Sequence, residues 1–351
     1  MSITFRLSYS VNDKLLQDMV NPPVEFVPEE PAGISVYFSS RPAAINRQLI
    51  VSAKTSREVP FARANESREV AEGRLPKGSI TKEAGSAVTE RNLLKPDHVP
   101  PLGALPHDFQ EVCDKIHDEL YDSVRRKVDL VRWRGGLTSG KQHNLLGHVA
   151  FEFSLDDGQT WKPVPHRLRL ALSLGFPVSK EGLSQEIFDD VSRFNSTVKE
   201  PVSRQLFREA WGVRQNNPGA SLVIGFAAVE LGCKEFIQEV VPMASWLAVE
   251  APSPPIDKIL KSYIPTLPSR SQRGGKAAIP DEHRKLVQKA MIARNKLAHR
   301  GELSLFAGEL ENVLRAINDL LWLLNYHAGY EWALQYVSGE VRSQLDMPSQ
   351  K

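Results

Sequence analysis

The residues of this chain with the clearest capacity for chemistry lie together near its C-terminal end. The sequence Arg-Asn-Lys-Leu-Ala-His covers positions 294 to 299 and brings a guanidinium, a side-chain amide and an imidazole into one short segment. An arginine fork binds phosphate oxygens through two parallel hydrogen bonds, and an imidazole can take up or release a proton near neutral pH. Arg294, Asn295 and His299 are therefore the candidate catalytic residues, for a reaction in which charge builds up on a phosphate.

A helix over 281–298 is predicted to carry these residues. Pro280 and Asp281 are typical of a helix start, and Gly301 is typical of the position after a helix end. An unpaired buried arginine is costly. Because Arg294 falls in the middle of the apolar stripe of this helix, we expect a partner carboxylate, a neighbouring chain or an anionic ligand. The stripe consists of Leu286, Val287, Ala290, Met291, Leu297 and Ala298.

A purely structural role explains the same residues differently. Arg294 can extend its charge past the stripe to water, and His299 can cap the helix C-terminus, where positive charge is favourable. Two observations separate the alternatives. A plain helical scaffold predicts an ion pair of Arg294 inside one chain, whereas a catalytic imidazole of His299 must reach solvent or substrate.

The motif resembles the R-x4-6-H signature of HEPN domains, with Arg294, Asn295 and His299 at the signature positions. The resemblance covers approximately residues 200–345. It implies a small helical bundle that dimerises and brings two copies of the motif together. It also implies a metal-independent ribonuclease that needs no cofactor and acts on RNA in toxin–antitoxin, antiviral or RNA-processing systems, in some of which an antitoxin or another regulatory partner accompanies the enzyme. The same fold also serves as a non-catalytic RNA-binding or protein-interaction module.

An RNA substrate explains how an arginine and a histidine could suffice for cleavage. The 2′-hydroxyl of RNA can attack the adjacent phosphate if a group such as His299 moves the proton and a cation such as Arg294 stabilises the developing charge. Asn295 would orient the histidine or bond a phosphate or ribose oxygen. The expected products carry a 2′,3′-cyclic phosphate and a 5′-hydroxyl. Because Arg294 and His299 point about 140° apart on a regular helix, we predict a homodimer in which one chain supplies the arginine and the other the histidine.

Basic residues surround the motif in the sequence. Between Ser269 and Arg300 the chain has nine Lys or Arg and only two acids, although its overall net charge is +2. This local excess favours a phosphate backbone as partner. The residues expected to bind RNA are Lys289, Lys296 and Arg300. The basic segment 269–277 reads as a flexible loop, which would either sweep over a substrate or connect two helices.

The composition is that of a globular protein with two domains. The chain has 351 residues, of which 41% are hydrophobic and 25% charged, and this length is enough for two cores. Its two cysteines lack a metal-ligand pattern and predict a reducing compartment. No apolar stretch is long enough to span a bilayer, so we expect a cytoplasmic protein. Motifs of nucleotide-driven enzymes, zinc hydrolases and serine hydrolases are absent from the sequence.

The periodicity predicts an α+β protein, with a mixed N-terminal region over 1–190 whose role the sequence does not reveal. In that region the stretch 52–106 is predicted to be loop-rich or partly disordered, and a helix is predicted over 108–126. Ser154 to Trp161 matches the Asp-box turn but occurs once, which favours a hairpin turn held by Asp156. Strands are predicted near 3–9, 34–38, 49–51, 128–134 and 148–154 and in a run ending near Leu174.

The C-terminal region over 200–346 is predicted to be an all-α, HEPN-like bundle. Its helices should pack antiparallel around a shared core. They are predicted over 203–215, 219–241 and 256–263, then over the motif helix, over a long helix from Leu303 to Leu324, and over a last one through Leu345.

Overall fold

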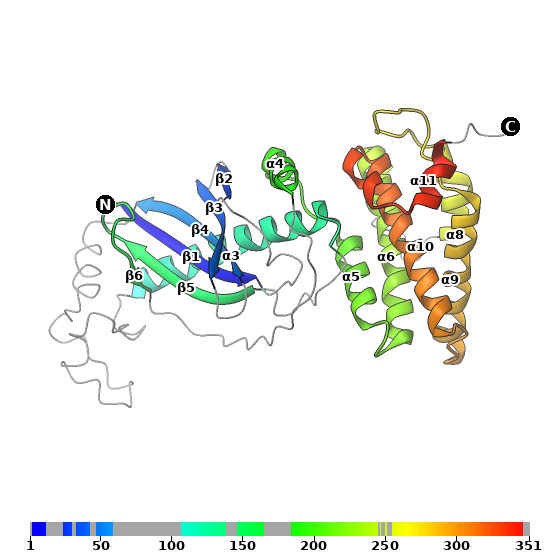
Figure 1. The fold of residues 1–351 in the computed structure, drawn as a ribbon, viewed down its shortest axis with the longest axis horizontal. Coiled ribbons are helices and arrows are strands. Elements are labelled where there is room, and N and C mark those ends of the chain that lie inside the picture. Colours follow the sequence, from blue (N-terminus) through cyan, green and yellow to red (C-terminus); the bar gives the residue numbers. More distant parts are fainter. Residues whose placement is uncertain are drawn as a thin grey trace. The chain divides into compact units, whose positions relative to one another are not determined.

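The computed structural model of the chain consists of two compact units, which are treated separately below. The first comprises Met1–Val131 and Asn144–Val198, and the second comprises Arg132–His143 and Lys199–Lys351. The fold class is α+β, with an antiparallel sheet in the first unit and helices in the second (Figure 1). The structure describes residues 2–11, 24–29, 33–42, 47–58, 107–137, 146–164, 184–244, 246, 250 and 255–346.

The first unit is built on a six-stranded antiparallel sheet with the order β2-β3-β4-β1-β5-β6. The strands predicted near 3–9, 34–38, 49–51 and 148–154 are confirmed, and β2 was not expected. The part of the predicted loop-rich stretch up to Glu58 belongs to a strand, and residues 59–106 lie outside the described residues, as does the strand expected before Leu174. The strands are β1 (Ser2–Val11), β2 (Val24–Glu29), β3 (Ile34–Pro42), β4 (Arg47–Glu58), β5 (Leu146–Ser154) and β6 (Lys162–Pro163).

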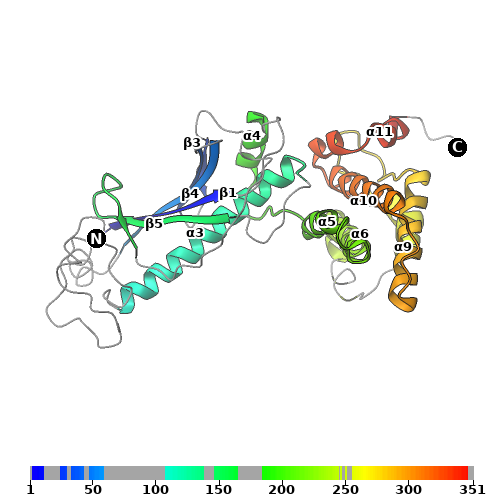
Figure 2. The ribbon, with the colours of Figure 1, turned by 60° about the horizontal axis from the view of Figure 1, so that its bottom comes forward.

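A long helix, α3 (His107–Arg134), covers one face of this sheet (Figures 1 and 2). Every second residue of β1 points toward it, as the period of two in a strand requires. The ring of Phe5 lies 6.5 Å from that of Phe109 in α3 and 6.2 Å from that of Phe151 in β5. A shorter helix, α4 (Gln185–Arg193), adds Phe188, whose ring lies 5.7 Å from that of Phe38.

The prediction of a strand over 128–134 is wrong, because these residues form the last two turns of α3. All of them are buried, so the helix shows no polar side that would reveal its period of 3.6 residues. The aromatic side chain of Trp133 belongs to the second unit, where its ring lies 4.7 Å from that of Tyr330 and 5.0 Å from that of Trp332. Burial of both the apolar and the charged residues, Asp129, Arg132 and Arg134, therefore explains why the helical period is hidden.

The turn between β5 and β6 has the predicted form. Asp156 accepts hydrogen bonds from the backbone N–H groups of Gln159 (3.1 Å) and Thr160 (2.9 Å). Hydrogen bonds from Ser154 and Thr160 lower the pKa of the Asp156 carboxyl to about 2. The indole of Trp161 lies beneath the guanidinium of Arg6, 4.1 Å from ring centroid to Cζ. Asp156 thus organises a hairpin.

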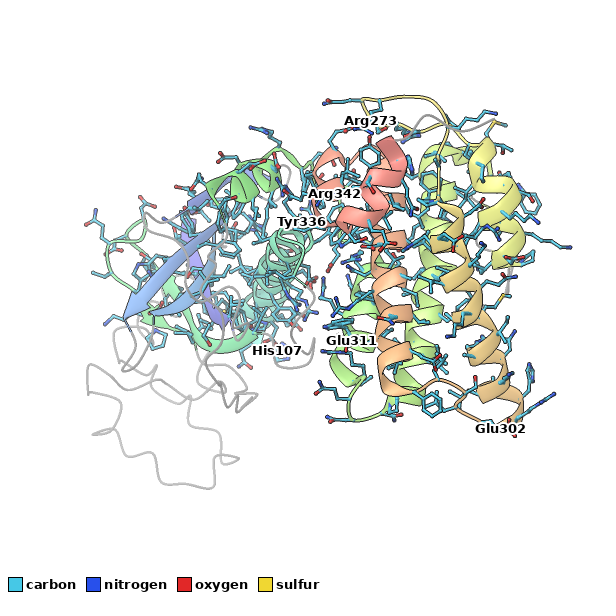
Figure 3. All side chains as sticks on the ribbon, turned by 45° about the vertical axis from the view of Figure 1, so that its right-hand side comes forward. His107, Arg273, Glu302, Glu311, Tyr336 and Arg342 are labelled. Carbon is cyan, nitrogen blue, oxygen red and sulfur yellow. The ribbon has the colours of Figure 1, made fainter. Side chains whose placement is uncertain are left out.

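The second unit is a helical bundle, as predicted. Four helices lie side by side in it: α5 (Val202–Val213), α6 (Pro218–Val240), α9 (Asp281–Arg300) and α10 (Ala307–His327) (Figures 1 and 3). The shorter elements are η2 (Pro242–Ala244), α8 (Ile256–Lys258), η3 (Ile259–Tyr263), η4 (Ile264–Thr266), η5 (Glu331–Tyr336) and α11 (Gly339–Asp346).

Antiparallel packing places the motif end of α9 beside the start of α6. A Cβ atom built on Gly219 would lie 3.4 Å from a methyl group of Leu297. The core between the helices is apolar and includes Phe226, Val229, Val287, Ala290, Leu314 and Ile317. Within the described part of the chain, no helix combines the length and the apolar character needed to cross a membrane.

Candidate active site

Helix α9 ends one residue after His299, and the reason is local. Gly301 has a φ of 70°, in the left-handed region where a Cβ atom is unfavourable, and its N–H donates to the carbonyl of Leu297 at 2.9 Å. This bond closes the C-terminal turn. His299 makes no hydrogen bond or ion pair with any residue that the structure describes, so the helix end does not depend on it as a cap.

The buried side of α9 is narrower than the predicted apolar stripe. It consists of His283, Val287, Ala290 and Ala293, with Leu297 and Met291 partly buried. Leu286 is 40% exposed and Ala298 is exposed, so their assignment to the buried stripe is wrong. Helix α9 packs against α6 and α10. A helical wheel of α9 alone cannot show how much of its circumference these two helices bury, so it cannot predict that Leu286 and Ala298 stay exposed.

Arg294 lies over the core but has only neutral partners. Its Cζ atom is 5.6 Å from the ring centroid of Phe226 in α6, and its Nη1 donates to Oδ1 of Asn295 at 3.1 Å. No carboxylate of the described residues pairs with Arg294. Glu230, one helical turn after Phe226 in α6, forms no such pair. Arg294 is thus partly buried as a residue, its guanidinium has an aromatic ring and an exposed amide as neighbours, and no carboxylate of the described residues supplies a counter-charge.

Two buried arginines of α5, Arg208 and Arg204, have a structural role in the same bundle and can be compared with Arg294. Arg208 in α5 is 1% exposed and donates from both terminal nitrogens to the carboxylate of Glu200. Nearby Arg204 stacks its Cζ atom 3.6 Å above the ring of Trp322 and donates to the side-chain oxygen of Asn318. Burial lowers the pKa of Arg204 to about 9. Arg294 has neither a carboxylate nor this depth of burial.

One chain brings together two of the three candidate catalytic residues. Arg294 and Asn295 are joined by the hydrogen bond between their side chains. Asn295 and His299 are exposed and lie one helical turn apart, whereas no contact joins His299 to Arg294. A phosphate held by the guanidinium would therefore need a histidine from elsewhere, or a change in conformation.

The three residues expected to bind RNA lie on the exposed side of α9, but they differ in their partners. The ammonium of Lys289 pairs with Glu309 in α10 at 2.7 Å. In the described residues no carboxylate pairs with Lys296 or Arg300, and both are exposed. These two cations are the ones most open to an added phosphate.

The remaining basic residues of this segment lie at the other end of the bundle. Figure 3 shows Arg273 at one end and Glu302, which follows the motif, at the opposite end. A helix of 20 residues such as α9 separates them by about 30 Å. The basic excess counted along the sequence therefore does not form one patch beside the motif.

Segment 269–277 is a closed turn and connects helices. Ser269 N–H donates to the Gly275 carbonyl at 2.9 Å, and Arg270 N–H donates to the His327 carbonyl at 2.8 Å. The Arg270 side chain also pairs with Glu239 at 2.7 Å. Of the two predicted roles, the geometry favours the connection and not the sweep over a substrate.

Two side chains near the motif carried no signal in the sequence. Phe226 supports the guanidinium of Arg294 from a position that reads as ordinary core. Phe306 falls within the helix predicted from Leu303 to Leu324. In the structure it precedes α10 and is 83% exposed. Only the three-dimensional arrangement shows that Phe226 contacts the guanidinium of Arg294 and that Phe306 lies on the surface.

Comparisons with known proteins give no match, whether with protein-family models, with curated proteins or with solved structures. The described residues also contain no group of three or more His, Cys, Asp or Glu side chains that could hold a metal ion.

Proposed function

We propose that the chain is a metal-independent endoribonuclease of the HEPN type, which cleaves RNA at a site made from Arg294, Asn295 and His299. The observation that carries the proposal is that the guanidinium of Arg294 lies over an aromatic ring and has no counter-charge among the described residues. Such a fixed cation is suited to a phosphate in a transition state, because it is held before the substrate arrives. The exposure of His299 meets the second requirement, access to a substrate.

In the proposed reaction the 2′-hydroxyl attacks the adjacent phosphate and the 5′-oxygen leaves. His299 takes up the proton of the 2′-hydroxyl as the new oxygen–phosphorus bond forms, and a proton returns to the 5′-oxygen as its bond to phosphorus breaks. Arg294 binds the non-bridging oxygens of the phosphate through its planar fork. Asn295 holds the guanidinium and is placed to bond a phosphate or ribose oxygen. The products carry a 2′,3′-cyclic phosphate and a 5′-hydroxyl, and the reaction needs no oxidant or external cofactor.

We further propose that two chains complete the site. Arg294 and His299 are separate in one chain, and the side of α6 next to Arg294 is incompletely covered. Val223 lies one turn from Phe226 and is 40% exposed. Further residues of α6 that are only partly buried are Ala220, Ile224, Ala227 and Leu231. A second copy seated on this apolar side would bury it and bring its own motif to the first.

The direct test is cleavage of structured RNA by the purified full chain in excess EDTA, followed by analysis of the new ends. We expect the wild-type protein to leave cyclic phosphates and the His299→Ala variant to lose at least about 100-fold in rate, the lower range for loss of a general acid or base. His107→Ala is a matched control, since His107 is an exposed histidine remote in sequence from the motif. It should cleave like the wild type.

Two results would contradict the proposal. Equal cleavage by wild type and His299→Ala would place the activity outside this site. RNA binding by the wild type without any cleavage would assign the chain to the alternative class, a non-catalytic RNA-binding or interaction module. A role in toxin–antitoxin or antiviral systems is part of the proposal only through the resemblance of the motif.

A further inference from the structure

An aromatic side chain stands exposed beside the basic residues of α9. The backbone N–H of Phe306 donates to Oε2 of Glu309 at 3.1 Å, and the other oxygen of the same carboxylate accepts from the ammonium of Lys289 at 2.7 Å. The carboxylate of Glu309 therefore binds both the backbone of Phe306 and the ammonium group of Lys289, which places these two groups close together on the surface. Lys289 and the backbone N–H of Phe306 both lower the pKa of Glu309, so it stays ionised in this position.

The exposure of Phe306 is unusual for its surroundings. The preceding residue, Leu305, is 7% exposed and belongs to the core, while Phe306 points away from it and is 83% exposed. The phenylalanines of α5 and α6, such as Phe207 and Phe226, are buried. A phenylalanine in solvent gains nothing from burial, so its large flat ring is available to a partner.

The cations of α9 are arranged as a row that begins at Lys289, the partner of Glu309. Lys289 and Lys296 are seven residues apart, and Arg300 follows four residues later, so all three lie on one side of the helix. On a wheel of about 100° per residue, His299 lies about 80° from the middle of this row and Arg294 about 140° from it. The row thus lies next to His299 around the helix, and Glu309 links its first member, Lys289, to the backbone of Phe306.

We propose that Phe306 and the row formed by Lys289, Lys296 and Arg300 are a track for single-stranded RNA, on which Phe306 stacks against an unpaired base. The inference rests on the proposed function and specifies its substrate class. Cations that follow a backbone, combined with an aromatic ring, are how proteins bind single strands. A base inside a duplex is covered on both faces by its neighbours, so it offers no free face to the ring.

The test measures RNA binding by the full chain in the His299→Ala background, where the RNA should stay intact. The probes are a short labelled single-stranded RNA and a blunt RNA duplex. Adding Phe306→Ala should weaken binding of the single strand by about 5- to 100-fold, the range for loss of one stacked base, and leave the duplex unaffected. Phe306→Trp should restore binding. Met243→Ala, at the opposite end of α6 and 91% exposed in the parent, is the matched control and should change nothing.

Several outcomes would overturn the inference, and they separate its failure from that of the proposed function. If Phe306→Ala and Phe306→Trp bind the single strand like the parent while Arg300→Ala binds it weakly, Phe306 is not a stacking residue and the ribonuclease proposal stands. If Phe306→Ala becomes monomeric in size-exclusion chromatography, the ring belongs to a contact between copies. If the parent binds neither RNA, both proposals fail.

Discussion

At the residue scale, the described arginines of the helical bundle differ in their partners and in their burial. Arg208 is matched by Glu200 and is best explained as part of the structure, because removing either partner would leave an uncompensated charge inside the bundle. Among the described residues, the guanidinium of Arg294 has an amide and an aromatic ring as partners and no carboxylate. Arg204 is likewise held by a ring and an amide, but it is 1% exposed, whereas Arg294 is only partly buried. An anion can therefore reach Arg294, and this access is the physical basis of the proposed function.

The position of Arg294 could be predicted from the sequence, but its partners could not. A wheel of α9 correctly places Arg294 among apolar residues, because the spacing of Val287 and Ala290 fixes that side of the helix. The partner across the bundle depends on how α6 is rotated and displaced relative to α9. Phe226, and not Glu230, faces the guanidinium for this reason, and nothing in either helix taken alone contains that information.

A buried histidine gives a prediction of pH-dependent stability. The pKa of His283 is lowered, chiefly by burial, although a hydrogen bond to the Ala316 carbonyl and the charges of Asp319 and Glu340 oppose the shift. As the pH falls below about 6.5, the unfolded chain takes up a proton at this residue before the folded chain does. The free energy of unfolding should therefore be retained above that pH and decrease between pH 7 and pH 5.

His283→Gln removes this titration and should flatten the decrease, which urea unfolding at a series of pH values would measure. His299→Gln, at an exposed position of the same helix, serves as the control. The interpretation would be contradicted if His283→Gln followed the same pH dependence as the wild type.

At the element scale, the wrong prediction over 128–134 and the confirmed helix prediction over 281–298 have a common cause. Periodicity is visible only where one side of an element meets solvent. Helix α9 has such a side, occupied by Lys289 and Lys296, so its period of 3.6 residues is evident. The end of α3 has none, because its charged residues Asp129, Arg132 and Arg134 are buried together with its apolar ones, and such a segment does not distinguish a helix from a strand.

The close packing of α6 against its neighbours gives a prediction about a glycine. A Cβ atom at Gly232 would lie 2.5 Å from a methyl group of Leu321 in α10 and 3.5 Å from Ser203 in α5. Gly232→Val should overpack this contact and lower the free energy of unfolding by about 1–3 kcal/mol. Gly212→Val is the matched control, because a Cβ atom at Gly212 meets nothing within 4 Å. Urea unfolding of both variants measures the difference, and equal stabilities would show that α6 and α10 are not packed this closely.

At the scale of the whole molecule, the order of the elements was largely predictable and the assembly of the site was not. Alternating strands followed by amphipathic helices indicate an α+β chain with a C-terminal bundle, and this fold is observed. The strand β2 escaped prediction because its six residues include a proline, which is disfavoured within strands. The site depends on which helices meet and on what covers the side of α6 that bears Val223, and neither follows from periodicity.

The central claim is that two chains share the site, with Arg294 from one and His299 from the other. It is tested most directly by co-expressing Arg294→Ala and His299→Ala, each inactive alone, and measuring RNA cleavage by the mixed dimers in EDTA. Random assembly gives mixed dimers in half of the population, each with one intact site, so we expect roughly a quarter of the wild-type activity. A mixture no more active than either variant alone would contradict the shared site.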